Sequence, residues 1–319
     1  MTRVRESTEL DLEQHRVELT GYCYRMLGSA FEAEDAVQET MVRAWRAAEK
    51  FEGRSSVRSW LYRIATNACF DMLSSSQRRA RPIDLTGTPT TDLTLGPLMP
   101  ETAWLQPIPD TSVLPERTDP AEVAVSRESI RLAFVAALQN LPPRQRAVLI
   151  LREVLCWRAA EVATLLDTTT ASVNSALQRA RATLAELDPA AADPFEPDDP
   201  HQRELLDRYV ELFEAYDIES LVRLLHEDAI SSMPPYLMWL SGPAEIARWM
   251  LGPGHECRGS TLVPTSANGL PAFGHYRPGG VPWSLHVLEI SDGKIHAMNN
   301  FLDTAALFPL FGLPMRLER

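Results

Sequence analysis

The placement of proline limits the folds open to this chain more than any other feature of its sequence. No proline precedes Pro82, and residues 8–79 place apolar side chains at i, i+3 and i+4, which predicts packed helices. Prolines then recur through residues 81–121 and 188–200, where they exclude regular helix and central strand. A break of about forty residues is much longer than the connections inside a compact domain, so the sequence predicts separate domains joined by linkers.

The breaks define the expected domains. We expect a helical domain over residues 1–80, a linker over 81–122, a second helical domain over 123–187, a short linker over 188–200 and a third domain over 201–319. In the third domain, helical patterns near 201–216, 218–226 and 243–251 precede alternating segments with turn signals at Asn268-Gly269 and Asp292-Gly293. Two all-α domains followed by an α+β domain are therefore the predicted fold class.

The long linker contains one segment that is unusual for a solvated tether. In "AWLQPIPD", Trp104 and Leu105 are large and apolar. Two interpretations stay open: a partly collapsed linker, or a segment that docks on a neighbouring domain.

The charge of the chain is unevenly distributed. The net charge is -12, yet residues 127–187 carry 8 Lys and Arg against 5 Asp and Glu, while residues 188–319 carry 9 against 19. Because the local field governs the encounter with a phosphate backbone, the overall acidity does not exclude nucleic-acid binding by the second helical domain.

The cysteines and the apolar runs bear on the compartment. The four cysteines are scattered, with no CxxC, which favours reduced cytoplasmic thiols over disulfides or zinc. No run of eighteen apolar residues occurs and Met1–Leu10 is charged, so we expect neither a membrane span nor a secretion signal. We expect a cytoplasmic protein with no cofactor and no metal site.

The stretch "EVATLLDTTTASVNSALQRARATL" has the pattern of a helix-turn-helix. Apolar faces at residues 160–165 and 173–180 flank a polar turn, in which Asp167 tolerates a left-handed backbone and Thr169 can cap the second helix. Such a second helix enters the major groove of DNA. An ordinary αα-hairpin with a polar face is the alternative. The candidate DNA contacts are Thr170, Ser172, Asn174, Ser175, Gln178, Arg179 and Arg181.

A family resemblance covers both helical domains. "LPPRQRAVLILREVLCWRAAEVATLLDTTTASVNSALQRARATL" resembles the promoter-reading domain of extracytoplasmic-function (ECF) sigma factors of bacterial RNA polymerase. "DAVQETMVRAWRAAEKFEGRSSVRSWLYRIATNACFDML" looks like their other conserved domain, which binds core polymerase and melts the promoter. The resemblance implies transcription initiation at −35 and −10 elements, with core RNA polymerase (the β′ coiled coil and the β subunit) and promoter DNA as partners.

The resemblance also implies roles for single residues. Asp35, Gln38, Glu39 and Arg43 match the segment that docks on the β′ coiled coil, although periodicity alone would make them a solvated helix face. The apolar positions of residues 36–45, Trp45 among them, are expected to face the core. Candidates for −10 recognition are Phe51, Arg54, Ser55, Ser56, Arg58, Trp60, Arg63 and Asn67, with Arg78, Arg79 and Arg81 near backbone phosphates. Trp60 also suits a plain core position.

The helix-turn-helix departs from the family pattern at two positions. Many members have a basic residue where this chain has Asn174, and another where it has Ala176. Fewer positive charges predict a weaker and less salt-sensitive hold on the −35 element.

Residues 201–319 resemble a SnoaL-like domain, the cone-shaped α+β fold that some ECF sigma factors carry in cis. A ligand pocket is possible there, and its candidates are Met233, Tyr236, Trp239, Trp283 and His286. Possible general bases are His286, Glu289, His296 and Asp303, but each stands alone in the pattern, so we expect a regulatory domain without catalysis. Its acidity suggests an intramolecular contact with the basic DNA-facing surface of the helical domains.

Two other functions are consistent with parts of the sequence. A one-component repressor or activator would have a helix-turn-helix and a sensor domain, but would leave residues 1–80 unexplained. A SnoaL-like cyclase or isomerase would explain only the last third of the chain. Binding to core polymerase discriminates the sigma factor from both.

Overall fold

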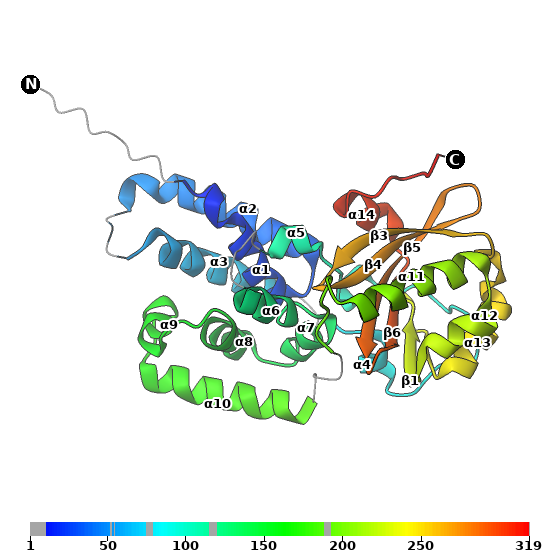
Figure 1. Ribbon diagram of the computed structural model, residues 1–319. Helices are drawn as coiled ribbons and strands as arrows, with labels where there is room; N and C mark the ends of the chain where they lie inside the picture. The colour runs from blue at the N-terminus through cyan, green and yellow to red at the C-terminus, as the bar shows by residue number, and fades with distance from the viewer. Residues whose placement is uncertain are drawn as a thin grey trace, which may run out of the picture.

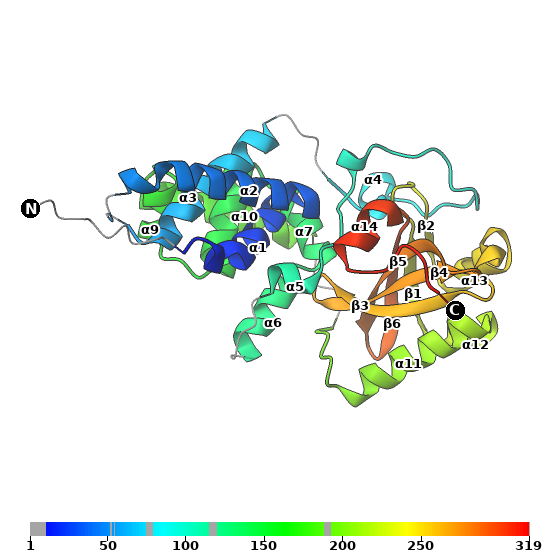
Figure 2. The same cartoon turned by 90° about the horizontal axis from the view of Figure 1, so that it is seen from above.

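The computed structural model describes residues 11–51, 53, 55–74, 79–114, 120–187 and 193–318. Helices dominate one side of the molecule, and a mixed sheet with its own helices forms the other (Figures 1 and 2). This order of helices first and strands afterwards is the one predicted from the sequence.

The first helical unit consists of α1 (Arg16–Leu27), α2 (Ala30–Ala47) and α3 (Val57–Leu73). Gly28, at φ 70°, ends α1, and the Oγ of Ser29 accepts a hydrogen bond from Glu32 N at 3.2 Å to begin α2. Positive φ favours glycine, and serine is a preferred helix cap, so the tight corner between the two helices follows from the sequence.

The second helical unit packs directly on the first. Its helices are α6 (Pro120–Glu128), α7 (Leu132–Leu138), α8 (Pro143–Leu149) with a π-helical turn at Ile150–Val154, α9 (Ala159–Leu165) and α10 (Thr170–Leu187). Tyr22 and Leu61 of the first unit share one continuous buried core with Val135 and Leu149 of the second.

The third unit is a six-stranded sheet with the order β2-β1-β6-β5-β4-β3. Its strands are β1 (Leu225–Ser232), β2 (Trp239–Ser241), β3 (Thr261–Ala267), β4 (Leu270–Arg277), β5 (Val281–Ser291) and β6 (Lys294–Phe301). The pairing is antiparallel except between β1 and β6, which run parallel. Asn268 (φ 57°) and Asp292 (φ 50°) turn the β3–β4 and β5–β6 hairpins, so both predicted turns are confirmed.

Helices cover both faces of this sheet. One face packs against α11 (Pro200–Ala215), α12 (Ile218–Leu221) and α13 (Pro243–Leu251). The other face packs against α14 (Thr304–Leu310) and against Leu132 of the second helical unit. The sheet is thus part of the junction with the helical units.

The long linker is bonded to the sheet domain at Thr90 and Met99 and is buried at residues 103–109, whereas most side chains of residues 84–102 are exposed. It forms two short helices, α4 (Pro82–Thr86) and α5 (Asp110–Val113). Trp104 and Leu105 are only 3% and 2% exposed, and Leu105 belongs to the core of the helical units. The docking interpretation of this segment is therefore the correct one.

Candidate functional site

Helices α9 and α10 form the helix-turn-helix predicted from the sequence (Figure 1). Asp167 adopts a left-handed backbone at φ 50°, and Ser172 N donates to the Oγ1 of Thr169 at 3.1 Å. The buried stripe of α10 consists of Val173, Leu177 and Ala180. Both local predictions for this turn are confirmed.

The polar face of α10 is open to solvent. All seven residues expected to contact the −35 element are exposed: Thr170, Ser172, Asn174, Ser175, Gln178, Arg179 and Arg181. Arg181 makes an ion pair with Glu153 at 2.6 Å, in which both side chains remain largely exposed. A pair of this kind contributes little and can exchange for a phosphate.

The residues expected at the −10 element fall into two groups. Ser55, Ser56, Arg63 and Asn67 are exposed, and the Oγ of Ser56 accepts from Ser59 N at 3.1 Å to cap α3. Trp60 is partly buried against the core, with its ring 4.7 Å from that of Phe51. Arg54 and Arg78 lie outside the residues that the structure describes.

Arg79 and Arg81, both expected near backbone phosphates, are each paired with a carboxylate in this structure. Arg79 is 5% exposed, pairs with Glu32 at 2.6 Å and donates to the carbonyls of Glu101 and Trp104 at 2.9 Å. These hydrogen bonds anchor the linker at Glu101 and Trp104, because a buried carbonyl group without a hydrogen-bond partner costs free energy.

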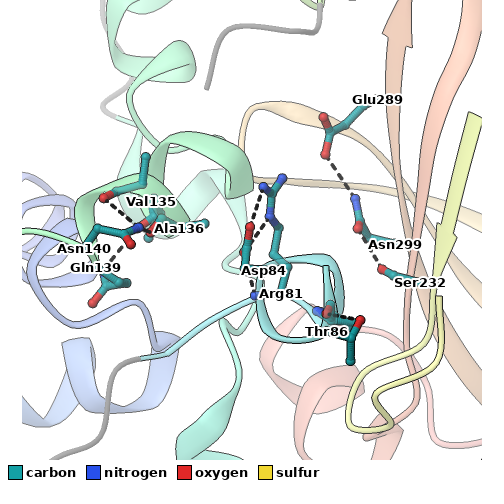
Figure 3. Close-up of polar contacts among 12 residues, drawn as sticks. Arg81, Asp84, Thr86, Val135, Ala136, Gln139, Asn140, Ser232, Glu289 and Asn299 are labelled. Carbon is teal, nitrogen blue, oxygen red and sulfur yellow. Dashed lines mark hydrogen bonds and ion pairs between the residues drawn. The ribbon is translucent and has the colours of Figure 1, made fainter. Parts of the chain in front are cut away.

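Arg81 is bound by the carboxylate of Asp84 at 3.0 Å, near the sheet residue Glu289 (Figure 3). Burial lowers the pKa of Arg81, but the hydrogen bond and charge of Asp84, with the charge of Glu289, outweigh it and leave that pKa raised.

Arg58 is held between the two helical units. Its guanidinium pairs with Glu18 at 2.7 Å and lies 5.2 Å from the ring centre of Tyr62 and 5.4 Å from that of Trp157. Trp157 comes from the second unit, and its ring stands 5.1 Å from that of Tyr62. One expected −10 residue is therefore part of the contact between the helical units.

The face of α2 expected to bind polymerase is exposed. Asp35, Gln38 and Glu39 are open to solvent, while Arg43 pairs with Glu39 at 2.6 Å and approaches Asp71 at 3.4 Å. The expectation that Trp45 faces the core is wrong, because its side chain is 73% exposed. The apolar periodicity did not identify Trp45 as a surface residue, although two arginines, Arg43 and Arg46, flank it on the same helix.

Buried arginines join the first helical unit to the second. Arg146 of α8 donates to Met26 O at the end of α1 and to the Oε1 of Gln139 at 2.6 Å. Arg25 of α1 donates to Ser129 O at 3.2 Å, and burial lowers the pKa of Arg25 to about 10. Buried guanidinium groups of this kind make a tight, oriented contact. No sequence pattern singled out either residue.

The tip of the β3–β4 hairpin inserts between the helical units and the linker. Asn268 is 0% exposed; its Nδ2 donates to Tyr24 Oη at 2.6 Å and to Ile130 O at 2.7 Å. Its Oδ1 accepts from Ile108 N at 3.1 Å, and Gly269 N donates to Asp110 Oδ1 at 2.7 Å. The SnoaL-like domain thus contacts the helical units through neutral groups of this hairpin, and this contact is not the expected one between an acidic domain and a basic DNA-facing surface.

The interior of the sheet domain holds a small cavity of about 40 Å³. Met233, Trp283 and His286 line it, as expected for the pocket, and so does His275. A cavity of this size holds a few water molecules at most.

The expectation that Trp239 and Tyr236 share this cavity with Met233, Trp283 and His286 is wrong. Trp239 lies on the edge strand β2, where its Nε1 donates to Thr86 Oγ1 at 2.7 Å and its carbonyl accepts from Thr90 N at 2.8 Å. Tyr236 faces a different cavity, which lies between the linker and the sheet domain.

His286 is not alone, contrary to the interpretation of the sequence. Its Nδ1 lies 3.1 Å from Tyr209 Oη and its Nε2 lies 3.1 Å from His275 Nδ1, while His275 Nε2 lies 2.8 Å from Ser260 Oγ. Burial lowers the pKa of His286 to about 3, and burial together with His286 and Arg277 holds the pKa of His275 well below its usual value.

Two neutral imidazoles satisfy this chain of hydrogen bonds when every donor points the same way, from Tyr209 towards Ser260. The pairing of β4 with β5, which brings His275 beside His286, is the signal that sequence reasoning missed.

The other candidate bases do not join this chain. Glu289 is buried and accepts from Asn299 Nδ2 at 3.1 Å, and Asn299 accepts in turn from Ser232 Oγ at 2.9 Å (Figure 3). Asp303 is exposed at the start of α14, and the ring of His296 meets that of His226 edge to face, with 5.5 Å between the ring centres. Within the described residues, no group of three His, Cys, Asp or Glu side chains is placed to hold a metal ion, and no helix has the length and apolarity to cross a membrane.

Known proteins match this arrangement. Residues 12–79 match Sigma-70 region 2 and residues 131–184 match Sigma-70, region 4. The ECF RNA polymerase sigma factor SigG of Mycobacterium tuberculosis is 48% identical over 310 residues, which cover 95% of this chain and 82% of that protein. SigJ of the same organism is 29% identical over 249 residues, which cover 76% of this chain and 72% of that protein.

The fold has a counterpart among solved structures. The crystal structure of the M. tuberculosis sigma factor SigJ matches with a TM-score of 0.62 and 22% identity, covering 95% of this chain and 98% of that one. The expected fold class, two all-α units followed by an α+β SnoaL-like domain, is confirmed. This chain belongs to the family of ECF RNA polymerase sigma factors.

Proposed function

We propose that this sigma factor binds core RNA polymerase through α2, reads the −35 element through α10 and the −10 element through α3, and is restrained in cis by its SnoaL-like domain. The observation that carries the proposal is the open polar face of α10, which has seven exposed candidates for DNA contact in a helix-turn-helix. Gln178 and Asn174 suit adenine, and Arg179 suits guanine or a phosphate.

The packing of the two helical units supports a restrained state. By their names, the two promoter elements are centred about 25 base pairs apart, or about 85 Å at about 3.4 Å per base pair. In the structure the two units share one core, and Tyr62 lies against Trp157. We propose that the units separate before both elements are contacted, and that Arg58 becomes available at that point.

The SnoaL-like domain is placed to oppose this separation. Asn268 contacts the first unit at Tyr24, the second at Ile130 and the linker at Ile108. Opening the helical units would break these bonds, so the domain favours the closed arrangement. The small interior cavity and the internally satisfied His275–His286 pair support a structural role for the domain rather than catalysis.

Run-off transcription with bacterial core polymerase tests the proposal. The full chain is compared with a variant that ends at Leu187, across candidate promoters. We expect initiation from both, with higher activity from the shortened chain because the restraint is gone. Failure of both variants with an active core would contradict the assignment of α2, α3 and α10, while a less active shortened chain would contradict the restraint alone.

Asn174→Arg is expected to strengthen the hold of α10 on a −35 duplex. One added phosphate contact should steepen the dependence of log affinity on log salt by about 0.9. Fluorescence anisotropy of a labelled duplex at several salt concentrations measures this slope. Ala185→Arg adds the same charge to an exposed position further along α10 and is the control. Equal slopes for the two variants would mean that position 174 is not at the DNA.

A further inference from the structure

A second and larger cavity lies between the linker and the SnoaL-like domain, with a volume of about 440 Å³. The linker contributes one wall with Leu98, Met99 and Trp104, and the domain contributes the other with Tyr236 and Phe301. This volume lies in the range of small-molecule sites, which are concave and mostly apolar with a few polar groups.

The charged side chains that line this cavity are all negative. Two carboxylates, Glu101 and Asp303, line it, and no lysine or arginine does. Glu101 Oε1 accepts from Gln106 Nε2 at 2.7 Å, and no hydrogen bond to the exposed Asp303 side chain occurs among the described residues. Arg79 donates to the backbone carbonyl of Glu101, but its guanidinium forms an ion pair with Glu32 and not with the carboxylate of Glu101.

The linker wall of the cavity is attached to the SnoaL-like domain at its start and to the first helical unit further along. Met99 N donates to Pro235 O at 3.1 Å, which ties the start of the linker wall to the domain. Further along, Gln106 N donates to Gly28 O at 3.1 Å, and Ser29 Oγ donates to Gln106 Oε1, which ties the linker to the first helical unit. Separation of that unit from the domain would therefore pull the cavity apart.

We propose that this cavity binds a small amphiphilic cation, with its apolar body between Leu98 and Tyr236 and its positive group at the carboxylate of Asp303. A molecule that spans both walls binds the closed arrangement and not the open one. By linkage it stabilises the closed arrangement in proportion to its concentration and affinity. Binding itself does not depend on the proposed transcriptional role, because the cavity is present in the chain without polymerase.

Three probes with one ring system and different polar groups test this site on the full chain: naphthylethylamine, naphthylethanol and naphthylpropionate. Fluorescence titration gives their affinities without polymerase. We expect the amine to bind about ten times more tightly than the alcohol, and the carboxylate more weakly than both. Equal affinities for the amine and the alcohol, or no binding of the amine, would overturn the proposal.

Matched variants locate the probe. Asp303→Asn is expected to remove most of the advantage of the amine, whereas Asp228→Asn, at an exposed carboxylate of β1, keeps it. Leu98→Ser should weaken the amine and the alcohol by the same factor, since it changes only the apolar wall on a side chain that is 65% exposed. An amine whose affinity for Asp303→Asn and for Leu98→Ser is the same as for the unaltered chain sits elsewhere and refutes the site.

Discussion

Replacing Asn268 by glycine is expected to loosen the whole molecule, because this one side chain bonds to the linker and to both helical units. Glycine keeps the left-handed backbone of the turn, so only the side chain is lost. Ile130 O and Ile108 N then lose the partners that they have at 2.7 and 3.1 Å. A buried polar group without a partner costs about 1–3 kcal/mol, so the closed arrangement should lose roughly 2–6 kcal/mol.

The radius of gyration from small-angle scattering and the midpoint of chemical unfolding measure this loss. We expect a larger radius and a lower midpoint for Asn268→Gly. The matched control is Asp292→Gly, since Asp292 has the same turn position and a left-handed backbone at φ 50°, but an exposed side chain. The backbone N–H of Asp292, which donates to Asp193 at 2.7 Å, survives in the control. Identical behaviour of the two variants would show that Asn268 does not hold the units together.

These two turns also show which features of the structure the sequence predicts and which it does not. Asn268-Gly269 and Asp292-Gly293 carry the same signal, and both form the predicted hairpin turn. Nothing local tells which turn is buried, because the partner Tyr24 lies 244 positions away along the chain. Asp167 and Thr169 were predictable for the opposite reason, since a helix-turn-helix is defined by neighbouring residues.

The candidate pocket shows the same limit. The pocket candidates were chosen from the sequence by residue type, and three of them, Met233, Trp283 and His286, do line one cavity. Trp239 does not, because β2 is an edge strand whose free side is occupied by Thr90 of the linker. The part of the linker that contacts this edge has no apolar periodicity, so the sequence predicted only irregular structure for it. Sequence patterns thus could not predict where the proline-rich linker docks on strands that are distant in the sequence.

Acid is expected to destabilise the SnoaL-like domain through its two buried histidines. In the folded chain burial lowers the pKa of His286 to about 3 and holds that of His275 well below its usual value, whereas both rings titrate near 6.5 when unfolded. Below pH 6.5 the unfolded chain binds more protons, so the free energy of unfolding falls as the pH falls. Each histidine contributes about 1.4 kcal/mol per pH unit, or about 2.7 kcal/mol for the pair, down to the folded pKa.

His286→Gln isolates this contribution. Glutamine still offers Tyr209 an acceptor and His275 a donor, but it has no proton to gain in this range. We expect the slope of unfolding free energy against pH, measured by urea titration between pH 4.5 and 6, to fall by about 1.4 kcal/mol per unit. Carboxylates also add to the slope, but they do so equally in both proteins and cancel in the difference. His255→Gln, at an exposed ring, is the control and should leave the slope as it is. An unchanged slope in His286→Gln would mean that the buried pair takes up protons without unfolding, and the neutral chain from Tyr209 to Ser260 would then be wrong.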